Sequence, residues 1–300
     1  MFENRFTRAN PGLIVFMIDQ SSSMDNDWSD GKSLAEQTAL VINRCVAEMI
    51  GRFTDIKDGV KESANVVFIG YGGIEQSDKA YVISSATIKK MANSPLKTEK
   101  VKQKISDGAG GLLEIENDIP IWIEPKAVWG TPMGDAFNQA YQLVDGWVTK
   151  KKNREVTPDA KEGQPQNDPI PIIINISDGA PTDSESDVRT YADKLKSISC
   201  PDGTPLIFNV HLSSDNKKTG LAEVQFPKDK SDLPVSDSMA ELLFDISSEL
   251  PEAFVKDAVD HGFNVVGGEK TFISNCKEVE HFIQFLNLGT NVAQPENNPG

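Results

Sequence analysis

The sequence LIVFMIDQSSSM, residues 13–24, is an apolar run that ends abruptly in an acid and a group of hydroxyls. Residues 13–18 are apolar without alternation and partly β-branched, which predicts a strand buried on both faces of a sheet. Asp19 therefore stands where that strand ends. In open α/β sheets, ligands bind in the crevice at the carboxyl ends of the strands, so Asp19 is a candidate binding residue.

Asp19, Ser21 and Ser23 are spaced by two residues. Alternate residues of an extended segment point the same way, with a rise of about 3.3 Å per residue, so we expect the three side chains to face one small cation. Oxygen donors without a neighbouring His or Cys favour a hard cation such as Mg²⁺ over zinc or copper. Taken alone, however, the cluster is better explained as a helix N-cap or a turn.

Two later stretches complete a pattern. Residues 130–134 read GTPMG, and residues 174–183 read INISDGAPTD. Together with Asp-x-Ser-x-Ser at residues 19–23, they resemble the metal-ion-dependent adhesion site of von Willebrand factor A domains. In that family a Gly-Thr loop opens a helix and a Ser/Thr-Asp-Gly loop follows a strand. Ser22 is a departure, because the family often has glycine between the two serines.

The resemblance implies a Rossmann-like α/β fold, with a doubly wound, mostly parallel six-stranded sheet, one antiparallel edge strand and helices on both faces. It also implies a Mg²⁺ site, with Mn²⁺ or Ca²⁺ as alternatives. Its site residues are Asp19, Ser21, Ser23, Thr131 and Asp178. In the family the hydroxyls ligate directly, the aspartates act largely through water or hydrogen bonds, and an acidic side chain of a partner completes the octahedron. An ion held mainly by hydroxyls keeps much of its charge for that carboxylate.

Two stretches, Asp-x-Ser-x-Ser-Met at residues 19–24 and LFDISS at residues 243–248, resemble the stand-alone bacterial members of the von Willebrand factor A family, of the tellurite-resistance type. This resemblance implies a cytoplasmic, metal-dependent protein-interaction module in stress or defence signalling, with a Ser/Thr kinase or a PP2C-type phosphatase as candidate partners. The alternative is a Mg²⁺-dependent phosphohydrolase with Asp19 as nucleophile. Against this enzyme, Ser21 occupies the place of a second aspartate, and the sequence has no glycine-rich phosphate loop or acid/base pair.

The composition of the chain further limits the classes of partner that it could bind. The formal net charge of −15 over 300 residues argues against binding nucleic acid or an anionic membrane surface. No apolar run approaches the ~20 residues of a membrane span, and the polar first eleven residues lack the apolar core of a signal peptide. Three scattered cysteines predict neither a disulfide framework nor a zinc site.

Apolar periodicity predicts the other elements. We expect helices over residues 32–53, from Thr131 onward, and over 188–198, 239–250, 252–259 and 278–286. We expect strands or extended pieces over 65–71, 80–88, 119–125, 170–176 and 206–212, and a last strand or hairpin over 263–266 and 271–273.

We interpret residues 1–288 as one domain with insertions at about 89–120, 150–169 and 213–236, followed by a frayed tail at 289–300. The insertion at 213–236 leaves a strand at its carboxyl end, so we expect it to shape the partner surface. Trp28, beside the site loop, is expected to touch the partner. The other tryptophans, Trp122, Trp129 and Trp147, are interpreted as packing in the core or at its rim.

Overall fold

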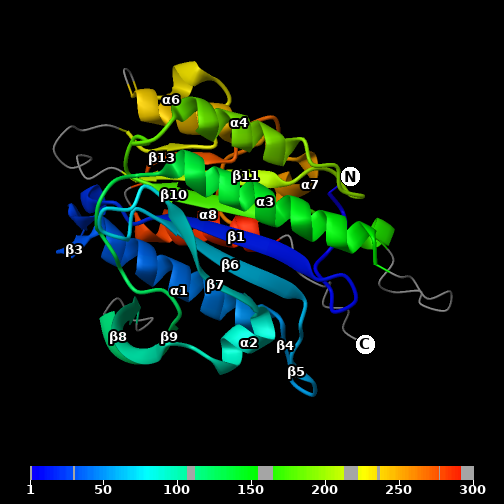
Figure 1. Ribbon diagram of the computed structural model, residues 1–300. Helices are drawn as coiled ribbons and strands as arrows, with labels where there is room; N and C mark the ends of the chain where they lie inside the picture. Colours follow the sequence, from blue (N-terminus) through cyan, green and yellow to red (C-terminus); the bar gives the residue numbers. More distant parts are fainter. Residues whose placement is uncertain are drawn as a thin grey trace.

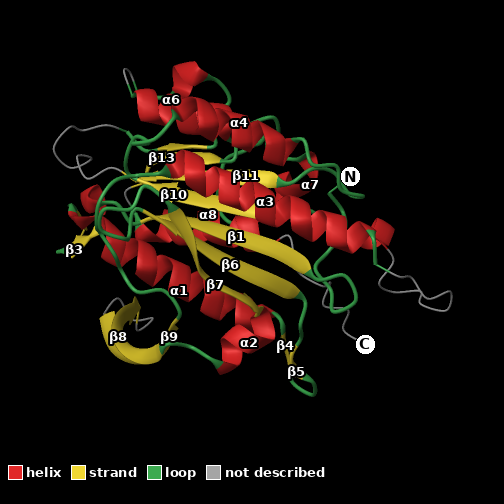
Figure 2. Cartoon of the chain, in the orientation of Figure 1, coloured by secondary structure: helices red, strands yellow, loops and turns green. Residues whose placement is uncertain are grey.

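The computed structural model describes residues 2–29, 31–106, 112–154, 165–212, 222–234, 237–276 and 278–291. Within these residues, seven strands form one sheet in the order β12-β13-β11-β10-β1-β6-β7, with helices on both faces (Figures 1 and 2). The strands are β1 (Gly12–Asp19), β6 (Ala64–Tyr71), β7 (Ala80–Thr87), β10 (Ile172–Ser177), β11 (Leu206–Leu212), β12 (Val224–Gln225) and β13 (Phe272–Cys276). This is the mostly parallel, doubly wound α/β fold expected from the sequence.

The sheet has one strand more than the six expected. β7 pairs antiparallel with β6 at one edge, as expected, and β12 pairs antiparallel with β13 at the other. Because β12 has only two residues, no apolar pattern could reveal it. The apolar residues at 263–266 are not a strand: Phe263 instead packs edge-on against Phe226 and Phe285.

The strand β1 lies at the centre of the sheet, and all eight of its residues are buried. Its parallel neighbours are β10 and β6. Its side chains alternate between two apolar cores, one receiving Ile14, Phe16 and Ile18, and the other receiving Leu13, Val15 and Met17. Burial on both sides explains why this segment is apolar without alternation.

Two layers of helices cover the sheet (Figure 1). The helices are α1 (Leu34–Arg52), α2 (Ile88–Asn93), α3 (Met133–Lys152), α4 (Glu185–Lys196), α6 (Ser238–Ile246), α7 (Glu252–Asp260) and α8 (Val279–Asn291). Apolar side chains of α1, α2, α7 and α8 enter one core, and those of α3, α4 and α6 enter the other. The first crossover helix, α1, begins at a capping box formed by Ser33 and Glu36.

The expected insertion at 89–120 contains regular structure. After α2, strands β8 (Lys97–Ser106) and β9 (Leu112–Ile121) form a separate antiparallel hairpin. At its base, the indole N–H of Trp122 donates to the Met91 carbonyl oxygen at 2.8 Å. Residues 107–111 lie outside the described part of the chain.

Several short elements complete the chain. They are the antiparallel pairs β2 (Asp27–Ser29) with β3 (Lys32–Ser33) and β4 (Thr54–Asp55) with β5 (Gly59–Val60), and the 3₁₀ helices η1 (Ser22–Asp25), η2 (Pro165–Asn167) and η3 (Lys230–Asp232).

Half of the expected insertion at 150–169 falls on residues 155–164, which lie outside the described residues. Ion pairs connect the two described ends of this insertion. Arg154 donates to both carboxylate oxygens of the buried Asp168 at 2.7 Å, and Lys151 donates to one of them at 3.3 Å. This cluster precedes β10, at the end of the sheet away from Asp19.

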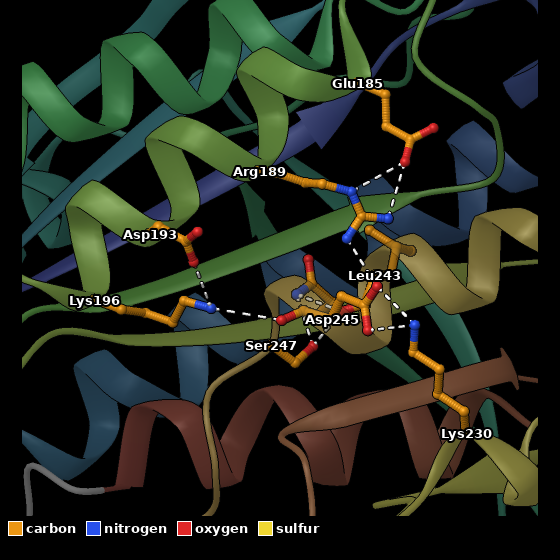
Figure 3. Close-up of polar contacts among 9 residues, drawn as sticks. Glu185, Arg189, Asp193, Lys196, Lys230, Leu243, Asp245 and Ser247 are labelled. Carbon is orange, nitrogen blue, oxygen red and sulfur yellow. Dashed lines mark hydrogen bonds and ion pairs between the residues drawn. The ribbon is translucent and has the colours of Figure 1, made fainter.

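The expected insertion at 213–236 is described over residues 222–234, and an ionic network anchors its later part (Figure 3). Asp245 of α6 accepts hydrogen bonds from Arg189 of α4 at 2.7 Å and from Lys230 of η3 at 2.9 Å. Burial alone would raise the pKa of Asp245, but these two hydrogen bonds hold it below its usual value. The network therefore fixes η3 against α4 and α6.

The C-terminal tail begins later than expected, since α8 continues to Asn291; the residues after it lie outside the described part. In the described residues, no helix has both the length and the apolar character needed to cross a membrane. The three cysteines are free thiols.

Candidate functional site

Asp19 is the last residue of β1 and is 1% exposed. One carboxylate oxygen accepts the backbone N–H of Ser21 at 2.9 Å, and the other accepts the hydroxyl of Ser177 at 2.6 Å. Ser177 is the last residue of β10, the parallel neighbour of β1. The carboxylate orientation is therefore set from two adjacent strand ends.

The hydroxyl oxygens of Ser21 and Ser23 lie 3.0 Å apart, and Ser23 donates to Asp178 at 2.8 Å. The side chains do converge, but not along an extended segment as expected. The chain turns into η1, where Met24 N–H donates to Ser21 O and Asn26 N–H donates to Ser23 O, each at 3.0 Å. This tight turn, rather than strand alternation, brings the two hydroxyls together.

Thr131 comes to the same place from the loop before α3. Its N–H donates to the Thr182 hydroxyl at 2.8 Å, and the Thr182 N–H donates to the Thr131 carbonyl oxygen at 2.9 Å. A Cβ on Gly179 would lie 3.5 Å from the Ser23 hydroxyl oxygen and 3.9 Å from that of Thr131. The two hydroxyls therefore face the same small volume, which the missing side chain of Gly179 leaves open.

The loops that carry these residues are joined by backbone hydrogen bonds. Ser22 N–H donates to Trp129 O at 2.9 Å, and Val128 N–H donates to Gln20 O at 2.7 Å. The loop after β6 closes against them at Gly72, which has a φ of +90°. Since a Cβ there would lie 2.1 Å from the Gly130 carbonyl oxygen, only glycine fits.

The electrostatics of the site are dominated by two carboxylates. Burial, and then the charge of Asp178, raise the pKa of Asp19 to about 7. Burial likewise raises the pKa of the half-buried Asp178. Ionising both groups at neutral pH is therefore unfavourable unless a positive charge joins them.

This donor set fits a hard divalent cation. Each candidate side chain presents oxygen: hydroxyls from Ser21, Ser23 and Thr131, and carboxylates from Asp19 and Asp178. In the described part of the chain, no group of three or more His, Cys, Asp or Glu side chains could hold a metal ion. A metal bound here would therefore depend on the hydroxyls, and it would offset the charge of the two acids.

Ser177 and Asp183 belong to the motif at residues 174–183, and the structure gives each of them a supporting role that the sequence did not indicate. Ser177 fixes the Asp19 carboxylate. Asp183 accepts the N–H groups of Gly134 at 3.0 Å and Asp135 at 2.9 Å, so it caps α3 from a different loop. The sequence does not reveal this cap, because Asp183 lies about 50 positions after the start of α3.

The expectation that Trp28 contacts a partner was wrong. Trp28 is buried, and its indole N–H donates to the Cys276 carbonyl oxygen at 2.9 Å, so it cannot contact a partner. Trp129, interpreted from the sequence as packing, is exposed beside the site. Position along the chain could not distinguish the two, since both lie close to a site loop.

No protein-family model matches the chain, and no curated protein matches it. Solved structures do match. The pilus adhesin SpaC from Lactobacillus rhamnosus GG has a TM-score of 0.50 and 11% identity, covering 96% of this chain and 31% of the adhesin. This chain thus spans about a third of the adhesin's length. At this identity the likeness shows a shared fold alone.

Two further structures are less similar. A variant of the PilB minor pilin from Streptococcus sanguinis has a TM-score of 0.43 and 10% identity, covering 94% of this chain and 61% of the pilin. Manganese-loaded TRAP protein from Plasmodium vivax has a TM-score of 0.32 and 11% identity, covering 70% of this chain and 61% of TRAP.

Proposed function

We propose that this chain is a metal-dependent protein-interaction module. In this proposal Mg²⁺ is held by the hydroxyls of Ser21, Ser23 and Thr131. Asp19 and Asp178 orient these ligands and offset part of the positive charge of the ion. A carboxylate from a protein partner completes the coordination. The observation that carries the proposal is the convergence of hydroxyls from separate loops beside the buried Asp19 and the half-buried Asp178, at the carboxyl edge of the sheet.

The hydrogen-bond directions support this assignment. Ser23 donates its hydroxyl hydrogen to Asp178, so Ser21 is the donor in the 3.0 Å contact between the two serine hydroxyls, and one lone pair of the Ser23 oxygen is left for a cation. Asp19 has both oxygens occupied by donors and therefore suits a supporting role better than direct ligation. With neutral hydroxyls as the direct ligands, the ion keeps enough charge to attract an external carboxylate.

The same geometry weakens the alternative of a phosphohydrolase. A nucleophilic Asp19 would need an oxygen free to attack phosphorus, whereas both of its oxygens accept short hydrogen bonds and the residue is buried. The finer predictions from the sequence remain proposals: kinship with tellurite-resistance proteins, a cytoplasmic role in stress or defence signalling, and a Ser/Thr kinase or PP2C-type phosphatase as partner.

Calorimetric titration of Mg²⁺, Mn²⁺ and Ca²⁺ into chelator-treated protein tests the metal site. We expect binding by the wild type, loss of binding in Ser23→Ala and Thr131→Ala, and unchanged binding in Ser22→Ala. Ser22 is a matched control because its exposed side chain lies between the two candidate serines. Absence of metal binding in the wild type, or equal affinity in all variants, would contradict the proposed site.

A further inference from the structure

A row of buried polar side chains crosses one face of the sheet close to the candidate site. Tyr71 ends β6, Asn175 lies in β10 and Asn209 lies in β11, and all three are buried. Asn175 and Asn209 each stand two positions after an apolar core residue, Ile173 and Ile207, so they lie on the sheet face that α3, α4 and α6 cover. Polar groups in such a core are costly unless they are hydrogen-bonded, so their partners matter.

The hydrogen bonds along this row run in one direction. The amide nitrogen of Asn209 donates to the Ser247 hydroxyl at 2.8 Å and to the Leu243 carbonyl oxygen at 3.4 Å. Because a carbonyl oxygen can only accept, the amide oxygen of Asn209 faces the other way, and it accepts the amide nitrogen of Asn175 at 3.0 Å. The amide oxygen of Asn175 is therefore left to accept the Tyr71 hydroxyl, at 2.8 Å.

Tyr71 thereby joins two strands that do not pair with each other. In the sheet order β1 lies between β6 and β10, so the tyrosine side chain spans β1 to reach its acceptor. Its hydroxyl also donates to the Ile176 carbonyl oxygen at 3.2 Å. Burial, and then the charge of Asp19, raise the pKa of Tyr71 well above its ordinary value, so the hydroxyl stays protonated and remains a donor.

On the β6 side, this link leads straight into the loops of the candidate hydroxyl ligands. Tyr71 is the register partner of Asp19, and the next residue, Gly72, packs tightly against two of those loops. A Cβ on Gly72 would lie 2.1 Å from the Gly130 carbonyl oxygen and 2.9 Å from the Ser21 nitrogen. Movement of the end of β6 would therefore displace both loops.

On the β10 side, the link precedes the acids of the site. Asn175 stands two positions before Ser177, which orients the Asp19 carboxylate, and three positions before Asp178. The Tyr71–Asn175 hydrogen bond thus sets the separation between the hydroxyls on one side and Asp178 on the other. Mg²⁺ demands near-ideal octahedral geometry, whereas Ca²⁺ accepts longer and more variable distances, so a fixed separation favours the smaller ion.

We infer that Tyr71 is a positioning residue that makes the proposed centre selective for Mg²⁺ over Ca²⁺. It acts through Asn175 and the end of β10, by holding the two sides of the site at one separation. This inference rests on the proposed function, since selectivity requires an ion at the site.

Calorimetric titration of Mg²⁺ and of Ca²⁺ into chelator-treated protein measures the selectivity as the dissociation constant for Ca²⁺ divided by that for Mg²⁺. Tyr71→Phe removes only the hydroxyl and should weaken Mg²⁺ binding by about tenfold while weakening Ca²⁺ binding less, so that the ratio falls. Asn175→Ala breaks the same contact from the other strand and should also lower the ratio. Because both changes act through one hydrogen bond, the double variant should lower it no further than the more affected single variant.

Two more variants separate positioning from a loss of stability. Ser247→Ala removes the last hydroxyl of the same row, while the Leu243 carbonyl oxygen still fixes the direction of the hydrogen bonds. This variant should lower the free energy of unfolding without changing the selectivity ratio. Tyr191→Phe, at a partly exposed tyrosine of α4, should change neither quantity. Urea unfolding in EDTA compares the stabilities of all the variants.

Other results would overturn the inference. Equal affinity of the wild type for the two ions, or an unchanged ratio in Tyr71→Phe, would show that the hydroxyl does not set selectivity and would leave the proposed function standing. The same fall of the ratio in Ser247→Ala would mean that lost stability, and not the Tyr71 contact, loosens the site. No binding of Mg²⁺ by the wild type would reject both the inference and the proposed function.

Discussion

Ser23 donates its hydroxyl to Asp178 across 2.8 Å, joining two loops that are 155 positions apart in the sequence. This bond links the loop after β1 to the loop after β10. The Ser23 hydroxyl oxygen lies beside the same Cβ position of Gly179 as that of Thr131. The Ser23–Asp178 hydrogen bond therefore connects two of the loops that form the candidate binding site.

Asp178→Asn should weaken Mg²⁺ binding by about tenfold or more, equivalent to about 1.4 kcal/mol. The amide oxygen can still accept the Ser23 hydrogen, so the fold and the thermal midpoint should change little. Asp193→Asn, on the exposed face of α4, serves as the control. Unchanged Mg²⁺ affinity in the Asp178 variant by calorimetry would show that this acid has no part in metal binding.

The metal-free protein should gain stability from Asp19 as the pH falls from about 7 toward about 4. The folded-state pKa of about 7 lies above the ordinary value of 3.8, so in this window the folded state binds a proton that the unfolded state releases. Mg²⁺ favours the ionised carboxylate and opposes this protonation.

The rise in thermal midpoint caused by Mg²⁺ should therefore shrink as the pH falls from about 8 to about 6. Melting curves in Mg²⁺ and in EDTA across this range measure the effect. Asp19→Asn should abolish the pH dependence of the difference. A Mg²⁺ effect in the wild type that grows on acidification would be incompatible with proton competition at Asp19.

Gly72→Ala should destabilise the protein by about 2 kcal/mol or more, because the added methyl would overlap the Gly130 carbonyl oxygen in a left-handed backbone conformation. Gly146→Ala is the opposite case. It lies within α3 with open space around its Cβ position, so it should stabilise by about 0.5–1 kcal/mol. Urea unfolding of both variants measures the contrast; equal effects would mean that the Gly72 contact is not tight.

Asp245→Asn should reduce the free energy of unfolding by about 1 kcal/mol, since it weakens two partly exposed charge contacts, with Arg189 and Lys230. The folded-state pKa of Asp245 is depressed, so the stabilisation is present above its ordinary value of 3.8 and is lost as the pH falls through the folded-state pKa. Acid unfolding followed by circular dichroism tests this. Mg²⁺ affinity should not change, and a change would mean that η3 couples to the metal site.

Much of the fold could be predicted because the buried strands and amphipathic helices have strong periodic signals. β1, β6, β10 and β11 are mostly apolar, and α1 carries both an apolar stripe and a capping box. The hairpin of β8 and β9 was not predicted as a hairpin: its charged and glycine-rich segment was interpreted only as an insertion, and the extended piece expected over 119–125 overlaps the last residues of β9. β12 was too short to give any pattern.

In the candidate site, the sequence was sufficient to choose Asp19, Ser21, Ser23, Thr131 and Asp178, but not to explain their geometry. The turn at η1 depends on backbone hydrogen bonds that the spacing of the serines does not encode. The supporting contacts come from distant loops, as in the cap that Asp183 provides for α3. The exposure of Trp129 arises from a left-handed backbone conformation that no periodicity indicates.

The most direct test of the central claim is the coupling between the metal and an external carboxylate. Mg²⁺ would be titrated calorimetrically into the protein alone, with a glycine-serine peptide carrying one aspartate, and with the same peptide carrying asparagine. The account predicts tighter Mg²⁺ binding with the aspartate peptide and no change with the asparagine peptide, because coupling between two ligands is reciprocal. Identical Mg²⁺ affinities in all three titrations would contradict recognition of a partner carboxylate through the metal.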